Sequence, residues 1–435
     1  MTMMRRGAQV SIPFGRGHID VTVPSHAVVA SPRPWPRIAE DGTALVVRAL
    51  EAPIASPRLA DLARGMSHLV VITSDHTRAV PSRVTLPVLF AEARRYRPDL
   101  RITLLIGTGL HRAPSARELE EQLGGDVLST CHLAIHDATR AESLADLGEL
   151  STGSRLLVNR LLVEADLVVA EGLIEPHLFA GYSGGRKSIL PAVAGAESIF
   201  RNHRPEFIDH PRARNGVMDG NPVHEEMVEA ARRAGLKFIL NIIVAASGAL
   251  AAAVAGEPGA AHRAGVARLQ DLARCEVEPA EIVLVSNSGY PLDRDLYQCI
   301  KGLAVAADAA VTGATIVLIA ECVDGIGHQD FCRLASMKIG PSRILQAIRQ
   351  GVVPPRDGWQ VQILARILER HRVVVVSPNL DAHDIREMHM EWAPDVETAL
   401  AGAYAHHGVD AGVIVIPEGP ATVIVPQKSG VPKVV

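Results

Sequence analysis

Short runs of β-branched and aliphatic residues alternate with helical patterns along most of this chain, and this alternation constrains the fold more than any other feature. In the first half, the predicted strands lie at residues 68–74, 101–107, 165–172 and 237–245. The predicted helices lie at residues 85–96, 115–125 and 223–235. Ser115 and Glu118 have capping-box spacing, which indicates a helix start there. Strands that alternate with helices predict an α/β fold with largely parallel sheets.

The alternation restarts after a helical connection. Its elements are strands at 281–286, 314–321, 372–378 and 411–417 and helices from Asp295 and at 343–350, 361–370 and 396–407. A chain of 435 residues exceeds the size at which one hydrophobic core usually stops growing. We therefore expect two α/β domains, at residues 1–274 and 275–435.

Charge and cysteine content exclude several classes of protein. The net charge is −4 and charged residues make up 21% of the chain, so no broad basic field for nucleic acid is expected. The five cysteines are scattered and form no CxxC pair, which favours a reducing, cytoplasmic compartment. The N-terminus has no apolar signal segment, and polar residues interrupt the longest apolar run, at 238–256. We expect neither export nor a membrane span, and a small molecule as the partner.

Polar clusters follow several of the predicted strands. SDHTRAVPSR (residues 74–83), GTGLHRAPS (107–115) and EGLIEPH (171–177) each begin where a strand ends. In α/β proteins ligands bind at the carboxyl ends of the strands. We therefore expect His76, Arg78, His111 and His177 to face one cleft.

The stretch GYSGGRKS (residues 181–188) resembles a Walker A loop but has Arg186 where that motif needs glycine before the lysine. A triphosphate site is therefore disfavoured. Gly184 and Gly185 could let the main chain approach a single phosphate, with Arg186 and Lys187 adding positive charge. The alternative is an ordinary loop with a solvated lysine.

Other candidate residues have both a functional and a structural interpretation. His111, His177 and His203 lack HExxH spacing, so they are either catalytic histidines at strand ends or structural ones. Arg78 is a candidate clamp for a carboxylate, or else it pairs with Asp75 and orders the loop. The remaining candidates are Tyr297 and Lys301, which share a helix face, their neighbour Gln298, and Trp359, whose default role is packing.

These segments, together with FRNH (200–203), SGYPLDRDLYQCIKG (288–302) and DGWQVQILARILE (357–369), resemble in order the lactate racemase family that uses a nickel-pincer nucleotide. The resemblance covers nearly the whole chain and implies two α/β domains around an active-site cleft. It also implies a pyridinium mononucleotide with two sulfur-bearing arms that hold nickel together with a ring carbon. One arm would join Lys187 through a thioamide, and His203 would complete a square-planar site of a kind that suits Ni(II). Gly184, Gly185 and Arg186 would then bind the single phosphate of the nucleotide.

The reaction that the resemblance implies is racemisation of a short-chain 2-hydroxy acid through its 2-keto form, with hydride passing from C2 to the cofactor and back. His111 and His177 match the two bases that handle the hydroxyl proton. Arg78 matches the residue that holds the substrate carboxylate. The other matches to family positions are Gln298, Lys301 and Trp359 in the substrate pocket, and Asp75 and Tyr297 at the cofactor. Enzymes that make the cofactor are implied partners.

Three alternatives remain open at this point. The chain could be a racemase or epimerase of another 2-hydroxy acid in the same family. It could be a zinc hydrolase that uses the same histidines, although the missing HExxH and the presence of Lys187 count against it. It could also be a noncatalytic cofactor-binding protein, although such a carrier would not need two bases.

Overall fold

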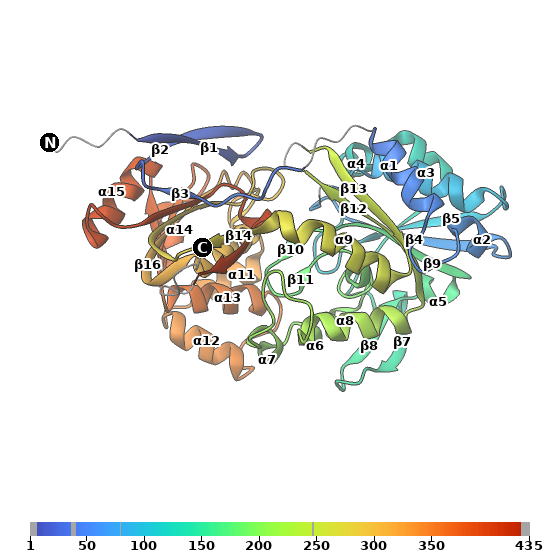
Figure 1. Cartoon of the computed structure of the whole chain (residues 1–435). Coiled ribbons are helices and arrows are strands. Elements are labelled where there is room, and N and C mark those ends of the chain that lie inside the picture. The colour runs from blue at the N-terminus through green and yellow to red at the C-terminus, as the bar shows by residue number, and fades with distance from the viewer. Residues whose placement is uncertain (1–6, 36–40, 79, 246–247, 428–435) are drawn as a thin grey trace.

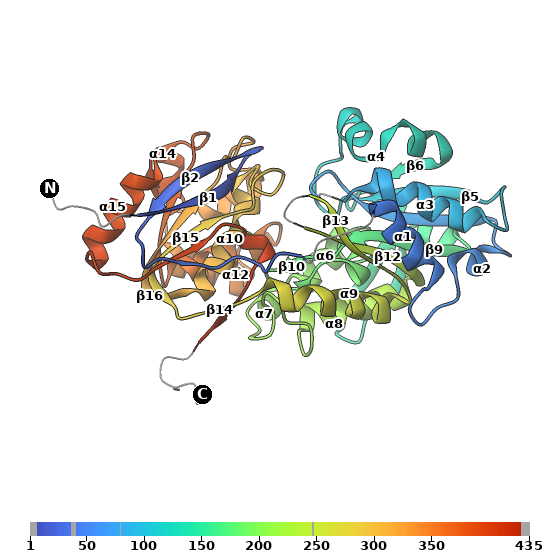
Figure 2. The same cartoon turned by 45° about the horizontal axis from the view of Figure 1, so that its top comes forward.

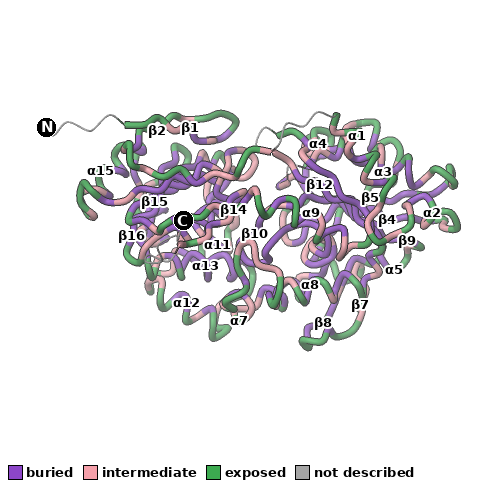
Figure 3. Tube along the Cα trace, in the orientation of Figure 1, coloured by how far each residue is buried: buried purple, intermediate pink, exposed green. Residues whose placement is uncertain are grey.

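The computed structural model describes residues 7–35, 41–78, 80–245 and 248–427, and it consists of two lobes that each contain a six-stranded sheet (Figure 1). Both sheets are largely parallel, which confirms the predicted α/β class. Buried residues run through the middle of each lobe, where the strands lie (Figure 3). In the part of the chain that is described, no helix has the length and apolarity needed to span a membrane.

The first sheet has the strand order β13-β12-β9-β4-β5-β6, and only β13 runs antiparallel to its neighbour. Its strands are β4 (His68–Ser74), β5 (Arg101–Gly107), β6 (His132–Ile135), β9 (Leu167–Leu173), β12 (Leu236–Val244) and β13 (Leu250–Gly256). The helices in this part of the chain are α1 (Gly42–Glu51), α2 (Leu59–Ala63), α3 (Ser82–Arg94), α4 (Ala116–Thr130), α5 (Leu161–Glu164), α6 (Ala196–Asn202), α7 (Pro205–Ile208), α8 (Pro222–Arg233) and α9 (Pro258–Ala273). Strand β9 is buried along its whole length, which explains its continuous apolar run. The predicted capping box of Ser115 and Glu118 starts α4.

The second sheet has the order β18-β17-β16-β15-β19-β3 and is parallel throughout. Its strands are β3 (Val28–Val29), β15 (Ala280–Ser286), β16 (Ala310–Ile319), β17 (Arg372–Val376), β18 (Glu391–Ala393) and β19 (Val413–Ile416). The helices of this lobe are α10 (Leu296–Asp308), α11 (Gln329–Ala335), α12 (Pro341–Arg349), α13 (Gly358–Leu368), α14 (Ala382–Glu387) and α15 (Val396–His407).

The N-terminal residues lie with the second lobe rather than the first. Strands β1 (Ala8–Phe14) and β2 (Gly17–Val23) form a hairpin beside the second sheet in both ribbon views (Figures 1 and 2). Ile12, Val21 and Val23 pack in one buried cluster with Ile282 and Leu284 of β15. The expected domain of residues 1–274 therefore differs from the structure at its start, because an apolar hairpin face does not by itself specify which sheet covers it.

Smaller strand pairs complete the fold and connect the lobes. They are β7 (Leu144–Glu149) with β8 (Arg155–Asn159), β10 (Pro176–His177) with β11 (Gly181–Tyr182), and β14 (Arg274–Val277) with β20 (Val423–Pro426). The β14–β20 pair brings the end of the described chain back to the connection after α9. One buried cluster contains residues of both lobes, including Phe179 and Trp359, so the two lobes pack against each other.

Candidate active site

A cavity lies between the lobes, at the carboxyl ends of β4, β5 and β9 and beside the first turns of α10 and α13. The sequence-predicted residues that line it are Asp75, Arg78, His111, His177, Gly184, Lys187, His203, Tyr297, Gln298, Lys301 and Trp359. Gly185 and Arg186 were predicted to lie there as well, but they are not among its lining residues. The strand-end argument therefore located the cleft, and each lobe contributes one wall.

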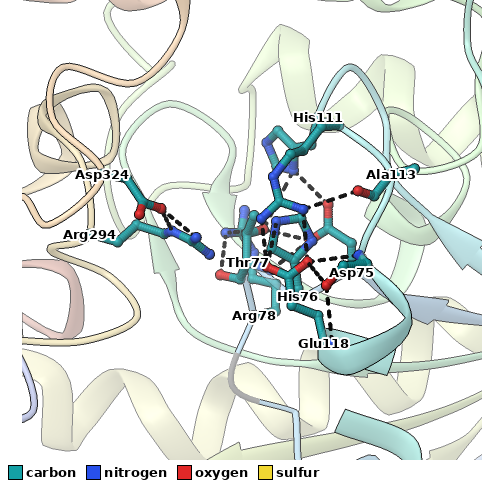
Figure 4. Close-up of polar contacts among 11 residues, drawn as sticks. Asp75, His76, Thr77, Arg78, His111, Ala113, Glu118, Arg294 and Asp324 are labelled. Carbon is teal, nitrogen blue, oxygen red and sulfur yellow. Dashed lines mark hydrogen bonds and ion pairs between the residues drawn. The ribbon is translucent and has the colours of Figure 1, made fainter. Parts of the chain in front are cut away.

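His111 is oriented by the buried carboxylate of Asp75 (Figure 4). Its Nδ1 lies 2.7 Å from Asp75 Oδ2, and Thr77 donates from its backbone N–H and its hydroxyl to Asp75 Oδ1. Burial raises the pKa of Asp75, but the charge and hydrogen bond of His111 and the bond from Thr77 outweigh it and hold the pKa below its usual range. Because the ionised carboxylate accepts from Nδ1–H, the Nε2 of neutral His111 carries a lone pair.

Arg78 lies in the same loop as Asp75, and its side chain approaches Glu175. Its Nε is 3.8 Å from Glu175 Oε1, and its Nη1 donates to the Thr77 carbonyl at 3.3 Å. The side chain of Asp75 is bonded instead to His111 and Thr77. The loop is therefore ordered by contacts other than an Asp75–Arg78 pair, and the Arg78 fork has only a loose carboxylate partner.

Further charged residues form the rim beside His111. Arg112 donates to Glu118 in the first lobe, and Arg294 donates to Asp324 within the second lobe (Figure 4). His76, which was expected to face the cleft, does not line the cavity, and its Nε2 lies 3.9 Å from a Glu118 oxygen. Its imidazole is buried, and that burial lowers its pKa.

His177 also presents its Nε2 to the cavity, but as a donor and not as an acceptor. The backbone N–H groups of Phe179 and Ala180 point at His177 Nδ1, at 3.5 and 3.3 Å, so this nitrogen accepts. In the neutral ring the proton therefore lies on Nε2. Burial, followed by the charges of Lys187 and Lys301, lowers the pKa of His177 well below its ordinary value.

The amine of Lys187 lies in the middle of this group. Its Nζ is 5.8 Å from the centre of the Phe179 ring. Burial, followed by the charges of Arg186, Arg78 and Lys301, lowers the pKa of Lys187 well below its usual range. A lowered pKa increases the share of the neutral amine, and the neutral amine is a nucleophile.

Side chains of β12 and α9 pack against the glycine-rich turn. The N–H of Gly185 donates to Asn241 Oδ1 at 2.8 Å, and a side chain on Gly185 would meet the His262 ring at 3.0 Å. Arg186 is buried and donates to the carbonyls of Ala180 and Gly184 within its own loop. Burial lowers its pKa to about 9. The expectation that Gly185 and Arg186 face a phosphate therefore differs from the structure, because residues of β12 and α9 occupy that side.

His203 follows α6 and has the orientation of a metal-binding imidazole. Its Nδ1 lies 3.0 Å from the carbonyl of Ile199, so Nδ1–H donates and Nε2 keeps its lone pair. The rings of Phe179 and Trp359 each lie 5.0 Å from it, edge to face. Burial, followed by the charge of Lys187, lowers the pKa of His203 to about 3, which keeps the ring neutral.

Helix α10 carries the polar residues of the second wall. Asp295 caps this helix by accepting from Gln298 N–H at 2.7 Å. Lys301 Nζ donates to Gln298 Oε1 at 2.8 Å, and Tyr297 lies one helical turn before Lys301. Burial, followed by the charge of Arg78, lowers the pKa of Lys301 to about 7.

Three further residues were missed by sequence reasoning. His328 lines the cavity, its ring stacks on Tyr297 with centres 4.0 Å apart, and its Nδ1 lies 3.1 Å from the buried carboxylate of Asp357. Phe179 separates His177 from His203. His328 follows β16, so the strand-end argument could have found it. Asp357 begins a segment that resembles the family, and Phe179 lies between two such segments.

The described side chains do not form a complete metal site by themselves. Among the described residues, no group of three or more His, Cys, Asp or Glu side chains could hold a metal ion. Catalytic zinc sites usually have three protein ligands. The zinc hydrolase alternative is therefore disfavoured.

Comparisons with known proteins agree along the whole chain. The lactate racemase N-terminal domain matches residues 14–216, and the lactate racemase C-terminal domain matches residues 275–425. The lactate racemase of Thermoanaerobacterium thermosaccharolyticum is 40% identical over 97% of this chain and all of its own length. That of Lactiplantibacillus plantarum is 38% identical over 87% of this chain and 90% of its own length.

Solved structures show the same relationship. The lactate racemase apoprotein from T. thermosaccharolyticum superimposes with a TM-score of 0.91 at 38% identity, covering 96% of this chain and 100% of that one. A Thermotoga maritima protein has a TM-score of 0.68 at 16% identity, covering 91% of this chain and 100% of that one, which shows a shared fold alone. The chain belongs to the lactate racemase family and is an isomerase.

Proposed function

We propose that this protein racemises a short-chain 2-hydroxy acid, lactate or a close analogue, by reversible hydride transfer at C2 with a nickel-pincer nucleotide attached to Lys187. Two relatives at 40% and 38% identity are named lactate racemases. The observation that carries the proposal is that one cavity contains two differently oriented imidazoles, His111 and His177, beside Lys187 and His203. A racemase needs a proton-transfer group on each face of its substrate.

The residues present fit the proposed cofactor. The lowered pKa of the Lys187 amine suits covalent attachment to a carbonyl-type or thiocarbonyl-type carbon, and the Nε2 lone pair of His203 suits nickel. When bound, the cofactor supplies the acceptor and then the donor of the C2 hydride. The phosphate would have to lie elsewhere than against Gly185 and Arg186, because these face Asn241, His262 and loop carbonyls.

The remaining chemistry belongs to the chain's own side chains. Arg78 and Lys301 are the cavity cations available for the substrate carboxylate, and they would hold C2 in place while either face is presented. His111 accepts the hydroxyl proton of one enantiomer at Nε2. His177 can accept the proton of the other enantiomer at Nε2 only as the Nδ1–H tautomer, in which its Nδ1 no longer accepts from the Phe179 and Ala180 backbone N–H groups. The rings of Phe179 and Trp359 limit water near His203.

Substrate identity and cellular setting are part of the proposal. Another 2-hydroxy acid is the alternative, because the side chains described here recognise the carboxylate and hydroxyl groups that such acids share. A noncatalytic cofactor carrier is disfavoured by the Asp75–His111 pair, which prepares a base. All five cysteines are free thiols, which supports a reducing, cytoplasmic compartment. Cofactor-synthesising enzymes are the partners that the proposal requires.

The first test is the mass of the protein made together with the cofactor-synthesis enzymes. We expect a covalent adduct on the peptide that contains Lys187, absent in Lys187→Ala. His203→Ala should keep the adduct but lose nickel in metal analysis. Active enzyme with unmodified Lys187 would overturn the proposal.

The second test separates hydride transfer from proton abstraction at C2. One pure enantiomer of lactate is racemised in deuterium oxide, and the C2 position is read by proton NMR. Hydride transfer keeps the original hydrogen at C2, because hydride does not exchange readily with water, whereas imidazolium protons do. Early, extensive deuterium at C2 would contradict the proposed function.

A further inference from the structure

A third imidazole faces the cavity from the second lobe and repeats the arrangement of the first. His328 Nδ1 lies 3.1 and 3.2 Å from the two oxygens of Asp357, as His111 Nδ1 lies 2.7 Å from Asp75. Both carboxylates are almost completely buried, at 1% and 2% exposure for Asp357 and Asp75. An ionised partner at Nδ1 leaves the His328 Nε2 with a lone pair.

The position of His328 relates it to His111 in particular. The ring centres of these two histidines are 6.0 Å apart at an interplanar angle of 69°. Stacking on Tyr297, with centres 4.0 Å apart, fixes the plane of the His328 ring. This separation is too long for a direct hydrogen bond between the two rings, and one water molecule can bridge it.

The two proposed bases differ in their access to water. The side chain of His111 is 25% exposed and that of His328 is 27% exposed, whereas His177 is 8% exposed. A proton taken from the substrate hydroxyl must leave the enzyme before the same base can act again. The solvent route therefore lies on the side where His111 and His328 meet.

We infer that His328, oriented by Asp357, is a proton relay that returns the His111 proton to water after each turnover. The inference rests on the proposed function. In the relay, protonated His111 gives its Nε2 proton to a bridging water molecule, this water gives a proton to the His328 Nε2, and His328 then gives a proton to water at the cavity mouth. Neutral His111 and hydronium are the net products, and no oxidant or reductant is needed.

The test compares His328→Phe with wild type in cofactor-loaded enzyme. Phenylalanine keeps a ring on Tyr297 but cannot carry a proton. We expect kcat in dilute buffer to fall by about tenfold or more, added imidazole to restore it, and the single-turnover rate with enzyme in excess to stay unchanged. The exposed His132 at the start of β6 offers a matched control, His132→Phe, which should change none of these values.

Other outcomes would overturn the relay. A slowed single turnover in one direction would make His328 a base that acts on the substrate itself, and a loss without imidazole rescue would make it a packing residue. A second readout uses cofactor-free protein, in which ¹⁵N NMR should find the His328 proton on Nδ1 in wild type but not in Asp357→Asn. A His328 proton on Nε2 in wild type would contradict the orientation. Wild-type protein that carries the cofactor but does not racemise would instead count against the proposed function.

Discussion

Single carboxylates and backbone groups decide what each histidine of the cavity can do. The Asp75 carboxylate and the Ile199 carbonyl accept hydrogen bonds from the Nδ1–H groups of His111 and His203. At His177, by contrast, Nδ1 accepts hydrogen bonds from backbone N–H groups. Three residues of one type therefore present two acceptors and one donor to the same space. Their different roles follow from hydrogen bonding, not from residue identity.

Arg78→Lys should weaken substrate binding. An ammonium group cannot reproduce the bidentate contact of a guanidinium group, and one charge-assisted contact contributes about 1.5–3 kcal/mol. We expect KM to rise by about 10- to 150-fold, as measured by steady-state racemisation of loaded enzyme. Arg112→Lys on the rim is the control and should leave KM unchanged. Unchanged kinetics in Arg78→Lys would assign Arg78 to loop structure.

Substrate affinity should depend on pH through Lys301. Its pKa of about 7 means that the amine is charged below that pH and neutral above it. KM for a 2-hydroxy acid anion should therefore be lowest below pH 7 and rise with pH, by at most about tenfold per unit. Lys301→Arg keeps its charge and should flatten that rise in a KM–pH profile. A profile identical to that of wild type would rule out Lys301 as the titrating group.

At the scale of elements, the loop between β11 and α6 shows how one sequence pattern fits two structures. Its glycines suggest a phosphate cradle, and Gly184 and Gly185 do adopt positive φ angles of 79° and 54°. The space that a phosphate would use near Gly185 is filled by Asn241 of β12 and His262 of α9. The loop is thus a rigid support that holds Lys187 at the cavity.

Gly185→Ala should destabilise the protein more than a comparable change elsewhere. A left-handed alanine costs about 1–2 kcal/mol, and crowding against His262 adds about 1–3 kcal/mol. Gly235→Ala is the matched control, because Gly235 has φ +74 and open space around its added carbon. Urea unfolding of cofactor-free protein gives both values. Equal losses in the two variants would show that the His262 contact is unimportant.

At the scale of the whole molecule, the N-terminal strands make the second lobe depend on the first residues of the chain. Ile12 is fully buried against the second sheet, and β3 forms the edge of that sheet beside β19. The chain therefore starts in the second lobe, continues through the first lobe, and then completes the second lobe. Both walls of the cavity then belong to one continuous packing unit.

Ile12→Ala should lower the free energy of unfolding by about 2–5 kcal/mol, because the surrounding side chains cannot fully close the cavity it leaves. Hydrogen exchange should increase first in β15 and β19 of the second sheet, and later in β4 and β9. Val28→Ala is the control at an exposed position and should change stability by less than about 0.5 kcal/mol. Faster exchange in the first sheet alone would contradict this assignment of the hairpin.

The amino-acid sequence by itself determined the fold class, the strands β4 and β5 to the residue and the start of α4, because these depend on local periodicity and local capping. The strand-end argument and the family resemblance also identified eleven of the residues that line the cavity. Only the tertiary structure decided that the first hairpin covers the second sheet and that Arg186 turns inward. It also decided that His328 meets His111, since 217 residues separate the two in the chain (328 − 111). Such pairings depend on which distant surfaces become buried together, and no local pattern carries that information.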